Sequence, residues 1–426
     1  MGANFQDNAP DSSGDDPASE QSLQAREEEL RSRFSYARTL IQYGRVPEAL
    51  TVITETEASA QRFWEKLPAD VRYLPHFLRG RAYLQQVEPA LAQPHLEAAL
   101  EIVREDQEAA ARVRNLLGVV YLEQQRPDLA LKQHLECLDV ALAKGFKDQD
   151  RSFRLSVYRN LANDYLATNN ILQAIDVYKQ ALVIMEDHHD LERQAGTHWG
   201  LAMAYQARND WTRAMAHGIR SVDIYESIGK KADAASVGLN LAEMLTDIGR
   251  YGDAERLLNR VKVLLDAIDN LELLGYFYIY RADLARKQKV MDNAKEYSTK
   301  ALELAEALIG EISTSEEIYV EGLVQAASGG GSKVGNGTSG KLWIAPVHVY
   351  IEALGVTAMV EEDLGHEDAA DRLFKHAVIL IQQIGFRDML RTMSWKYAKV
   401  LSSRGAHGKA VEYYSMAVDP NRYTPS

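Results

Sequence analysis

Small, bulky and polar residues recur along this chain with a long and regular period. The recurrence is clearest for alanine, at nine positions that we call the marker alanines: Ala49, Ala92, Ala130, Ala174, Ala214, Ala254, Ala294, Ala370 and Ala410. Most steps between them are 40 residues or close to it. Twelve residues before each marker stands Ala or Gly, and nine residues before it most units have Tyr or Leu. A period of this length indicates an array of stacked supersecondary repeats.

The pattern within each repeat predicts two helices of about 14 residues joined by a tight turn. Gly249 precedes Asp253 and Gly365 precedes Asp368, and in such turns glycine ends one helix while an acidic residue opens the next. The small residues let two helices approach closely, and a bulky residue one turn away fills the adjoining gap. We therefore predict an all-α, right-handed superhelical solenoid of about nine repeats, with about 18 helices and no sheet.

The domain organisation follows from where the period holds. We expect one solenoid over residues 25–418, a disordered acidic tail over residues 1–24 and a short C-terminal tail over residues 419–426. The period breaks once, because 76 residues separate Ala294 from Ala370. This span includes the Gly/Ser-rich residues 328–340, which cannot stay helical because each glycine costs about 1 kcal/mol relative to alanine. We predict a flexible loop there.

Composition narrows the class of protein. The net charge of −13 argues against a nucleic-acid surface, which needs clustered Lys and Arg. Cys137 is the single cysteine, so no internal disulfide can form, and this suits a reducing cytoplasm. No apolar run reaches the roughly 18 residues of a membrane span. The first 20 residues also lack the basic start and apolar run of a signal peptide.

Two stretches carry a family resemblance. Leu117-Gly118 and Tyr121 precede Ala130, and Leu161-Ala162 and Tyr165 precede Ala174, in the Leu-Gly-x-x-Tyr…Ala pattern at the expected spacing. The chain resembles the tetratricopeptide-repeat (TPR) family over about residues 30–418. The 40-residue period, longer than the usual length of about 34, is similar to the repeat regions of bacterial MalT-like proteins and peptide-sensing quorum regulators. The resemblance implies a fold that binds proteins or peptides.

Catalytic motifs find no support. The sequence has no G-x-S-x-G and no H-E-x-x-H. Residues 335–341 match the spacing GxxxxGK, but Leu342 stands where a phosphate-binding loop needs Ser or Thr. Residues 186–190 offer metal-ligand types, yet we interpret them as a solvated loop, and His134, His198 and His217 as ordinary helix positions. We predict no catalytic residue, no metal, no cofactor and no enzymatic activity.

The candidate site is the groove that the resemblance implies. In this family the first helix of each unit lines the concave surface, and we expect its exposed residues 11 and 15 positions before each marker. Those columns and the helical turns beside them supply the predicted peptide contacts, which are Arg81, Arg112, Asn115, Arg159, Asn163, Trp199, Met203 and Gln206. Arginine recognises carboxylates bidentately, and asparagine pairs with peptide backbone. The alternative is that these residues are merely solvated.

Two functions stay open at this point. The first is a non-enzymatic scaffold or signal receptor that holds a protein or peptide in the groove. The second is a regulatory sensor subunit that controls a separate enzyme or DNA-binding partner. Peptide-sensing regulators usually carry an N-terminal helix-turn-helix, and residues 1–24 are too short and too polar to form one, so direct nucleic-acid binding is not expected. The sequence predicts no membrane contact and leaves the oligomeric state open.

Overall fold

The computed structural model describes residues 17–86, 88–142, 151–186, 190–309 and 341–423. The chain divides into two units, Met1–Asn160 and Leu161–Ser426, and the division falls inside helix α8. Within the described residues the regular structure is entirely helical, which confirms the predicted fold class. The number of repeats and the handedness of the superhelix stay predictions.

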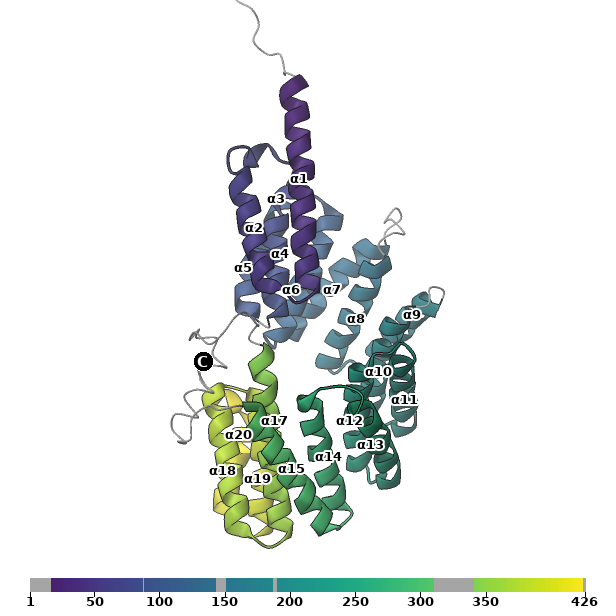
Figure 1. Cartoon of the computed structure of the whole chain (residues 1–426), viewed down its shortest axis with the longest axis vertical. Coiled ribbons are helices and arrows are strands. Elements are labelled where there is room, and N and C mark those ends of the chain that lie inside the picture. Colours follow the sequence, from purple (N-terminus) through teal and green to yellow (C-terminus); the bar gives the residue numbers. More distant parts are fainter. Residues whose placement is uncertain (1–16, 87, 143–150, 187–189, 310–340, 424–426) are drawn as a thin grey trace, which may run out of the picture. The chain divides into compact units, whose positions relative to one another are not determined.

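The first unit holds helical hairpins, in which α1 packs against α2, α4 against α5 and α6 against α7 (Figure 1). Its elements are α1 (Pro17–Gln42), α2 (Val46–Ala60), η1 (Trp64–Lys66), α3 (Ala69–Arg72), α4 (Leu74–Gln85), α5 (Pro89–Ile102), α6 (Gln107–Glu123), α7 (Pro127–Leu142) and the start of α8 (Arg151–Ala167). The predicted N-terminal tail reached residue 24, but α1 already begins at Pro17.

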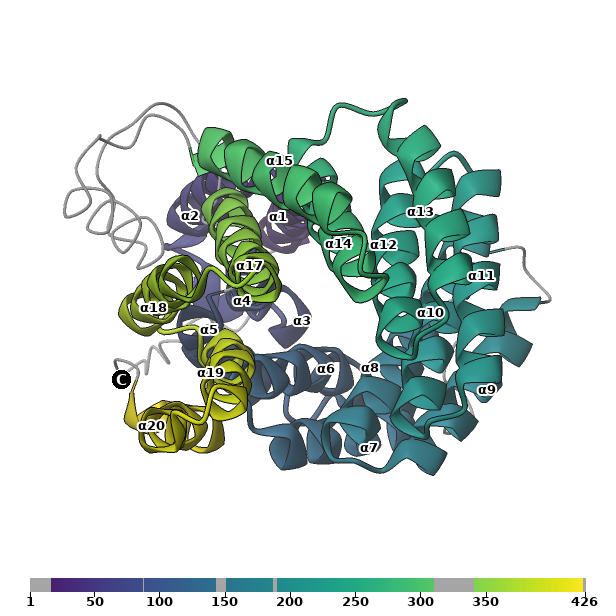
Figure 2. The same cartoon turned by 90° about the horizontal axis from the view of Figure 1, so that it is seen from below.

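The second unit continues the same scheme. Its helices are the end of α8, α9 (Ile171–Glu186), α10 (Leu191–Ala207), α11 (Trp211–Ser227), α12 (Lys231–Asp247), α13 (Tyr251–Leu265), α14 (Leu271–Lys287), α15 (Met291–Ile309), α17 (Lys341–Asp363), α18 (Glu367–Ile384), α19 (Arg387–Ser403), α20 (His407–Val418) and η3 (Pro420–Arg422). Within this unit α10, α12, α14 and α17 lie on one side, and their partners α11, α13, α15 and α18 lie on the other (Figure 2).

The predicted columns are the places where these helices touch. Eight marker alanines are 0% exposed and Ala410 is 2% exposed, and each lies in the second helix of a hairpin. The small residue 12 positions earlier is buried in every hairpin. At Gly118 a Cβ atom would stand 2.4 Å from Nε2 of buried His134. A helix backbone therefore lies too close at this point for any larger residue without movement of its neighbour.

The hairpin turns share one backbone conformation. The residue five positions before the marker has a positive φ in eight hairpins. Glycine takes this position four times, as at Gly249, whereas Lys289 adopts it with a φ of 64°. A left-handed conformation costs a residue with a Cβ atom about 1–2 kcal/mol, so the non-glycine turns carry local strain.

Lys289→Gly is therefore expected to raise the free energy of unfolding by about 1 kcal/mol. The substitution also removes the exposed ion pair between Lys289 and Asp363, at 3.7 Å. The loss of this pair should cost little stability, because exposed ion pairs contribute little. The control is Gln288→Gly, because Gln288 has a φ of −76° and glycine should destabilise there by about 0.5–1 kcal/mol. Urea unfolding of both variants checks the pair, and equal shifts would contradict this interpretation of the turn.

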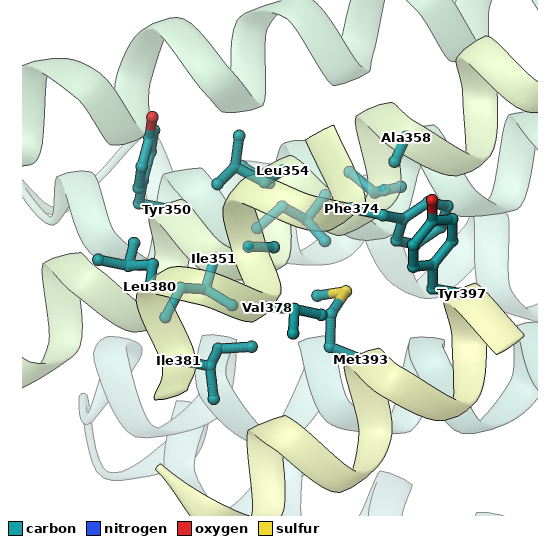
Figure 3. Packing of buried hydrophobic residues seen from close by; sticks show 14 of the residues in the cluster. Tyr350, Ile351, Leu354, Ala358, Phe374, Val378, Leu380, Ile381, Met393 and Tyr397 are labelled. Carbon is teal, nitrogen blue, oxygen red and sulfur yellow. The ribbon is translucent and has the colours of Figure 1, made fainter. Parts of the chain in front are cut away.

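The break in the period falls between α15 and α17. These two helices pack directly against each other. The predicted loop 328–340 and the GxxxxGK glycines lie outside the described residues. Beyond the break, α17, α18 and α19 enclose a continuous apolar core (Figure 3), in which the Phe374 and Tyr397 rings stack with centroids 4.8 Å apart.

Candidate functional site

The solvent-accessible side of the first helices, taken within each of the two units separately, is the candidate binding surface, and we call it the first-helix face. The residue 11 positions before the marker alanine is exposed or partly exposed in six consecutive repeats. These residues are Arg81, Val119, Asn163, Met203, Glu243 and Asp283. The residue 15 positions before the marker alanine is not exposed in every repeat, because Leu239 is only 2% and Ile279 only 4% exposed. A step of four residues turns 40° around a helix, which is enough to move that column into the contact with the next hairpin.

Arg81 on α4 is the most unusual cation of the first unit. Its side chain is partly buried, and burial, followed by the charge of Arg38 on α1, lowers its pKa. Among the described residues no carboxylate pairs with Arg81. Arg79, two positions earlier, does pair, with Glu57 at 2.7 Å. A partly desolvated guanidinium without a counter-ion is costly, so Arg81 is suited to receive an anionic group from outside.

Two more arginines lie near this position. Tyr73, immediately before α4, is buried, and burial raises the pKa of its hydroxyl. The charges of Arg112 and Arg38 act to lower this pKa, and those of Asp106 and Asp70 act to raise it. The Arg112 guanidinium lies over the Phe153 ring, 5.2 Å from its centroid. Arg38, Arg81 and Arg112 therefore place positive charge on α1, α4 and α6 of one unit.

Asn115 does not present its amide to solvent. It is 6% exposed, accepts a hydrogen bond from Asn160 Nδ2 at 3.2 Å and donates one to Ser156 Oγ at 3.5 Å. Its side chain therefore ties α6 to α8 inside the unit. Arg159 on α8 is exposed, and no ion pair with it is formed within the described residues.

The other four predicted contacts belong to the second unit. Asn163 accepts a hydrogen bond from the Tyr178 hydroxyl at 2.5 Å, so part of its capacity is used. Trp199 packs beside the buried cluster of α11 and α12. Met203 is 40% exposed and Gln206 is partly buried. Trp199 and Met203 together keep an apolar surface on α10 within reach of solvent.

The sequence pattern alone did not identify Arg38, which adds to the positive charge of Arg81 and Arg112. It also did not identify the ionisable residues around Glu243 in the second unit. Arg38 stands 11 residues before Ala49, in the same column as Arg81, and extending the columns to the first repeat would have found it. Farther along, burial raises the pKa of Glu243, which Tyr280 reaches with a hydrogen bond. Beyond them Lys396 pairs with Glu352 at 3.3 Å.

Other chemistry receives no support from the described segments. They contain no group of three or more His, Cys, Asp and Glu side chains placed to hold a metal ion. The Cys137 thiol is buried, donates to the Ala111 carbonyl oxygen at 3.1 Å, and has its pKa raised to about 12 by burial. None of the helices in these segments has the length and apolar character needed to span a membrane. The metal-ligand types at 187–189 lie outside the described residues.

Helical hairpins stacked through small-residue columns define an α-helical repeat protein. Two tetratricopeptide-repeat family models match the sequence, at residues 74–143 and 200–228. The chain therefore contains tetratricopeptide repeats in these two stretches. No protein with curated annotation matches it in a sequence search.

Solved structures share the fold over nearly the whole chain. The apo form of RapI has a TM-score of 0.61 at 13% identity, covering 92% of this chain and 97% of that one. The apo quorum sensor NprR from B. thuringiensis has a TM-score of 0.57 at 13% identity, covering 92% and 99%. Aspartyl phosphate phosphatase F from Bacillus subtilis has a TM-score of 0.54 at 14% identity, covering 92% and 93%. At these identities the likeness concerns the fold.

Proposed function

We propose that this chain is a non-enzymatic module that binds a peptide, or an extended segment of a partner protein, on its first-helix face. The observation that carries the proposal is Arg81, a partly buried guanidinium that no carboxylate pairs with in the described part of the chain. In this it differs from Arg79 on the same helix, which pairs with Glu57 at 2.7 Å. An unpaired arginine beside Arg38 and Arg112 favours an acidic ligand group.

The ligand chemistry follows from the donors. A guanidinium offers a planar fork of N–H groups that matches a carboxylate, so a free C-terminus or an acidic side chain fits the first unit. Phe77 is partly exposed and packs against the buried Tyr73 ring, with the ring centroids 5.6 Å apart, so Phe77 supplies apolar surface in the same part of this unit. Arg159 extends the positive charge along α8.

The first-helix face of the second unit, taken by itself, offers contacts of another kind. Trp199 and Met203 on α10 present an apolar surface that accepts an uncharged side chain. The amides of Asn163 and Gln206 can pair with peptide backbone. Since part of the affinity then comes from apolar burial, added salt should weaken binding without abolishing it.

The second candidate is a regulatory sensor subunit that controls a separate enzyme or DNA-binding partner. The likeness in fold to the quorum sensor NprR favours it. The same surface serves both candidates, because a sensor differs from a scaffold in what its bound state does to a partner. The cytoplasm, where Cys137 stays reduced, is the compartment we propose for either.

The test is selection from a library of short peptides by the purified protein. We expect wild type to enrich peptides with an acidic side chain or a free C-terminal carboxylate, and Arg81→Gln to lose this enrichment. Arg62→Gln is the matched control, because Arg62 is an exposed arginine of the same unit away from the first-helix face. Selection that is equal for all three folded proteins would move the binding site elsewhere.

A second selection tests the contribution of α8. We expect Arg159→Ala combined with Asn163→Ala to reduce peptide capture several-fold, because both side chains are exposed on one face of that helix. Circular dichroism confirms that the variant keeps its helices. If the folded variant captures peptides as well as wild type does, α8 is not part of the binding site. The role of Arg81 is then decided by the first selection alone.

A further inference from the structure

Two hairpins, α4–α5 and α10–α11, carry the same three rings at the same repeat positions. Histidine stands 16 residues before and three residues after the marker, and tyrosine nine residues before it. The members are His76, His95 and Tyr83 around Ala92, and His198, His217 and Tyr205 around Ala214. In both hairpins the two histidines face each other from the first and the second helix.

The geometry of the two pairs is alike. Nδ1 of His198 lies 2.9 Å from Nδ1 of His217, and their rings stack with centroids 5.2 Å apart. Tyr205 stacks on His217 at 5.5 Å with an interplanar angle of 7°. In the other hairpin the two Nδ1 atoms of His76 and His95 are 3.2 Å apart. Each contact is a direct hydrogen bond between two imidazoles.

Packing alone does not require histidine at these positions. In hairpin α14–α15 they are Tyr278 and Tyr297, whose rings stack at 6.4 Å. In other hairpins the residue three positions after the marker is aliphatic, as at Val177 and Leu257. An uncharged pair therefore makes the same interhelical contact, and what histidine adds is a proton that can come and go between pH 5 and 8.

The pair cannot hold two protons and keep its bond. A hydrogen bond between two Nδ1 atoms needs one N–H donor and one free lone pair, so the second protonation breaks it and brings two positive charges together. The charged groups around the His198–His217 pair oppose protonation as well: Lys179 on α9 and Arg213 and Arg220 on α11. Burial and then His217 lower the pKa of His198 to about 4.

The His76–His95 pair has a different surrounding. Burial lowers the pKa of both rings, and the charge of Arg79 acts in the same direction. Glu57 on α2 acts in the opposite direction on both. A nearby carboxylate makes protonation less costly, so this pair is the less sensitive of the two.

We propose that the His198–His217 pair is an acid-sensitive latch between α10 and α11, which keeps this hairpin closed while one ring is neutral and opens it when acid protonates both. The latch rests on the contact between the rings and stands whether or not the proposed peptide site is correct. Because Trp199 and Met203 lie on α10, opening changes the surface that this helix presents.

The sign of the effect follows from proton linkage. The closed hairpin binds protons less readily than the open one, so its stability is fully present above pH 6.5 and is lost as the pH falls toward 4. With a pKa of about 4 for His198 in the closed hairpin and 6.5 as its ordinary value, the equilibrium constant for opening rises about tenfold by pH 5.5.

Hydrogen exchange of the α10 and α11 amides at pH 7.5 and 5.5, corrected for intrinsic exchange rates, tests the latch. We expect wild type to lose protection about tenfold at pH 5.5. His198→Tyr with His217→Tyr, which copies the Tyr278–Tyr297 pair, should lose none. His76→Tyr with His95→Tyr is the control and should leave the response of α10 and α11 unchanged. Equal responses in wild type and in the His198/His217 variant would overturn the proposal.

A second test measures the pKa values of the histidines in the wild-type protein, so it does not depend on whether any variant folds. The chain has 11 histidines, and NMR of histidine-labelled protein follows each ring from pH 8 to pH 4. We expect at least one ring to stay neutral well below pH 6.5. Titration of all 11 rings close to pH 6.5 would overturn the proposal, because no ring would then resist protonation.

Discussion

Phe374→Ala is expected to lower the free energy of unfolding by about 3–5 kcal/mol. The Phe374 side chain on α18 is 0% exposed and stacks on Tyr397 of α19, within the apolar cluster shown in Figure 3. Its removal leaves a cavity that helices on three sides cannot close without losing their own contacts. Urea unfolding followed by circular dichroism gives the loss directly.

Ile379→Ala on the same helix is the matched control. Ile379 is 51% exposed, so truncation there should change the free energy of unfolding by less than about 1 kcal/mol. Similar losses for Phe374→Ala and Ile379→Ala would mean that α18 does not pack as described. A loss confined to Phe374→Ala supports the core between α17, α18 and α19.

Ala214→Leu should cost about 1–3 kcal/mol through overpacking. Ala214 is a marker alanine, 0% exposed, where α11 meets its neighbours. Ala216, two residues later on α11, is exposed, and Ala216→Leu makes the same chemical change on the solvent side. Thermal unfolding of the two variants separates the effects of packing from those of helix propensity. An unchanged melting curve for Ala214→Leu would show that the repeat period has been placed wrongly along the chain.

The small-residue columns predicted the fold because they record backbone approach. A position such as Gly118, where a Cβ atom would lie 2.4 Å from a neighbouring ring, tolerates so few residue types that the constraint is visible in the sequence itself. The exposed columns carry no such constraint. Leu239 and Ile279 were expected to face solvent and are buried, because 40° of rotation separates them from the truly exposed column.

The candidate site could be predicted only in part, for similar reasons. Arg81 follows from its column, but the absence of an acidic partner among the described residues depends on side chains from other helices. Asn115 looked available on a helical wheel, and a hydrogen bond from Asn160, 45 residues away, occupies it. The contact between His198 and His217 joins positions 19 residues apart, and it becomes visible only once the two helices of the hairpin are laid against each other.

The central claim is that Arg81 receives a carboxylate from a bound peptide, and a binding cycle tests it most directly. A peptide selected by the wild-type protein is made as the free acid and as the amide, and both are titrated by calorimetry into wild type and Arg81→Gln. We expect wild type to bind the free acid about tenfold or more tightly than the amide, as charge-assisted hydrogen bonds do. Arg81→Gln should lose this preference. A preference of equal size in Arg81→Gln would contradict the claim.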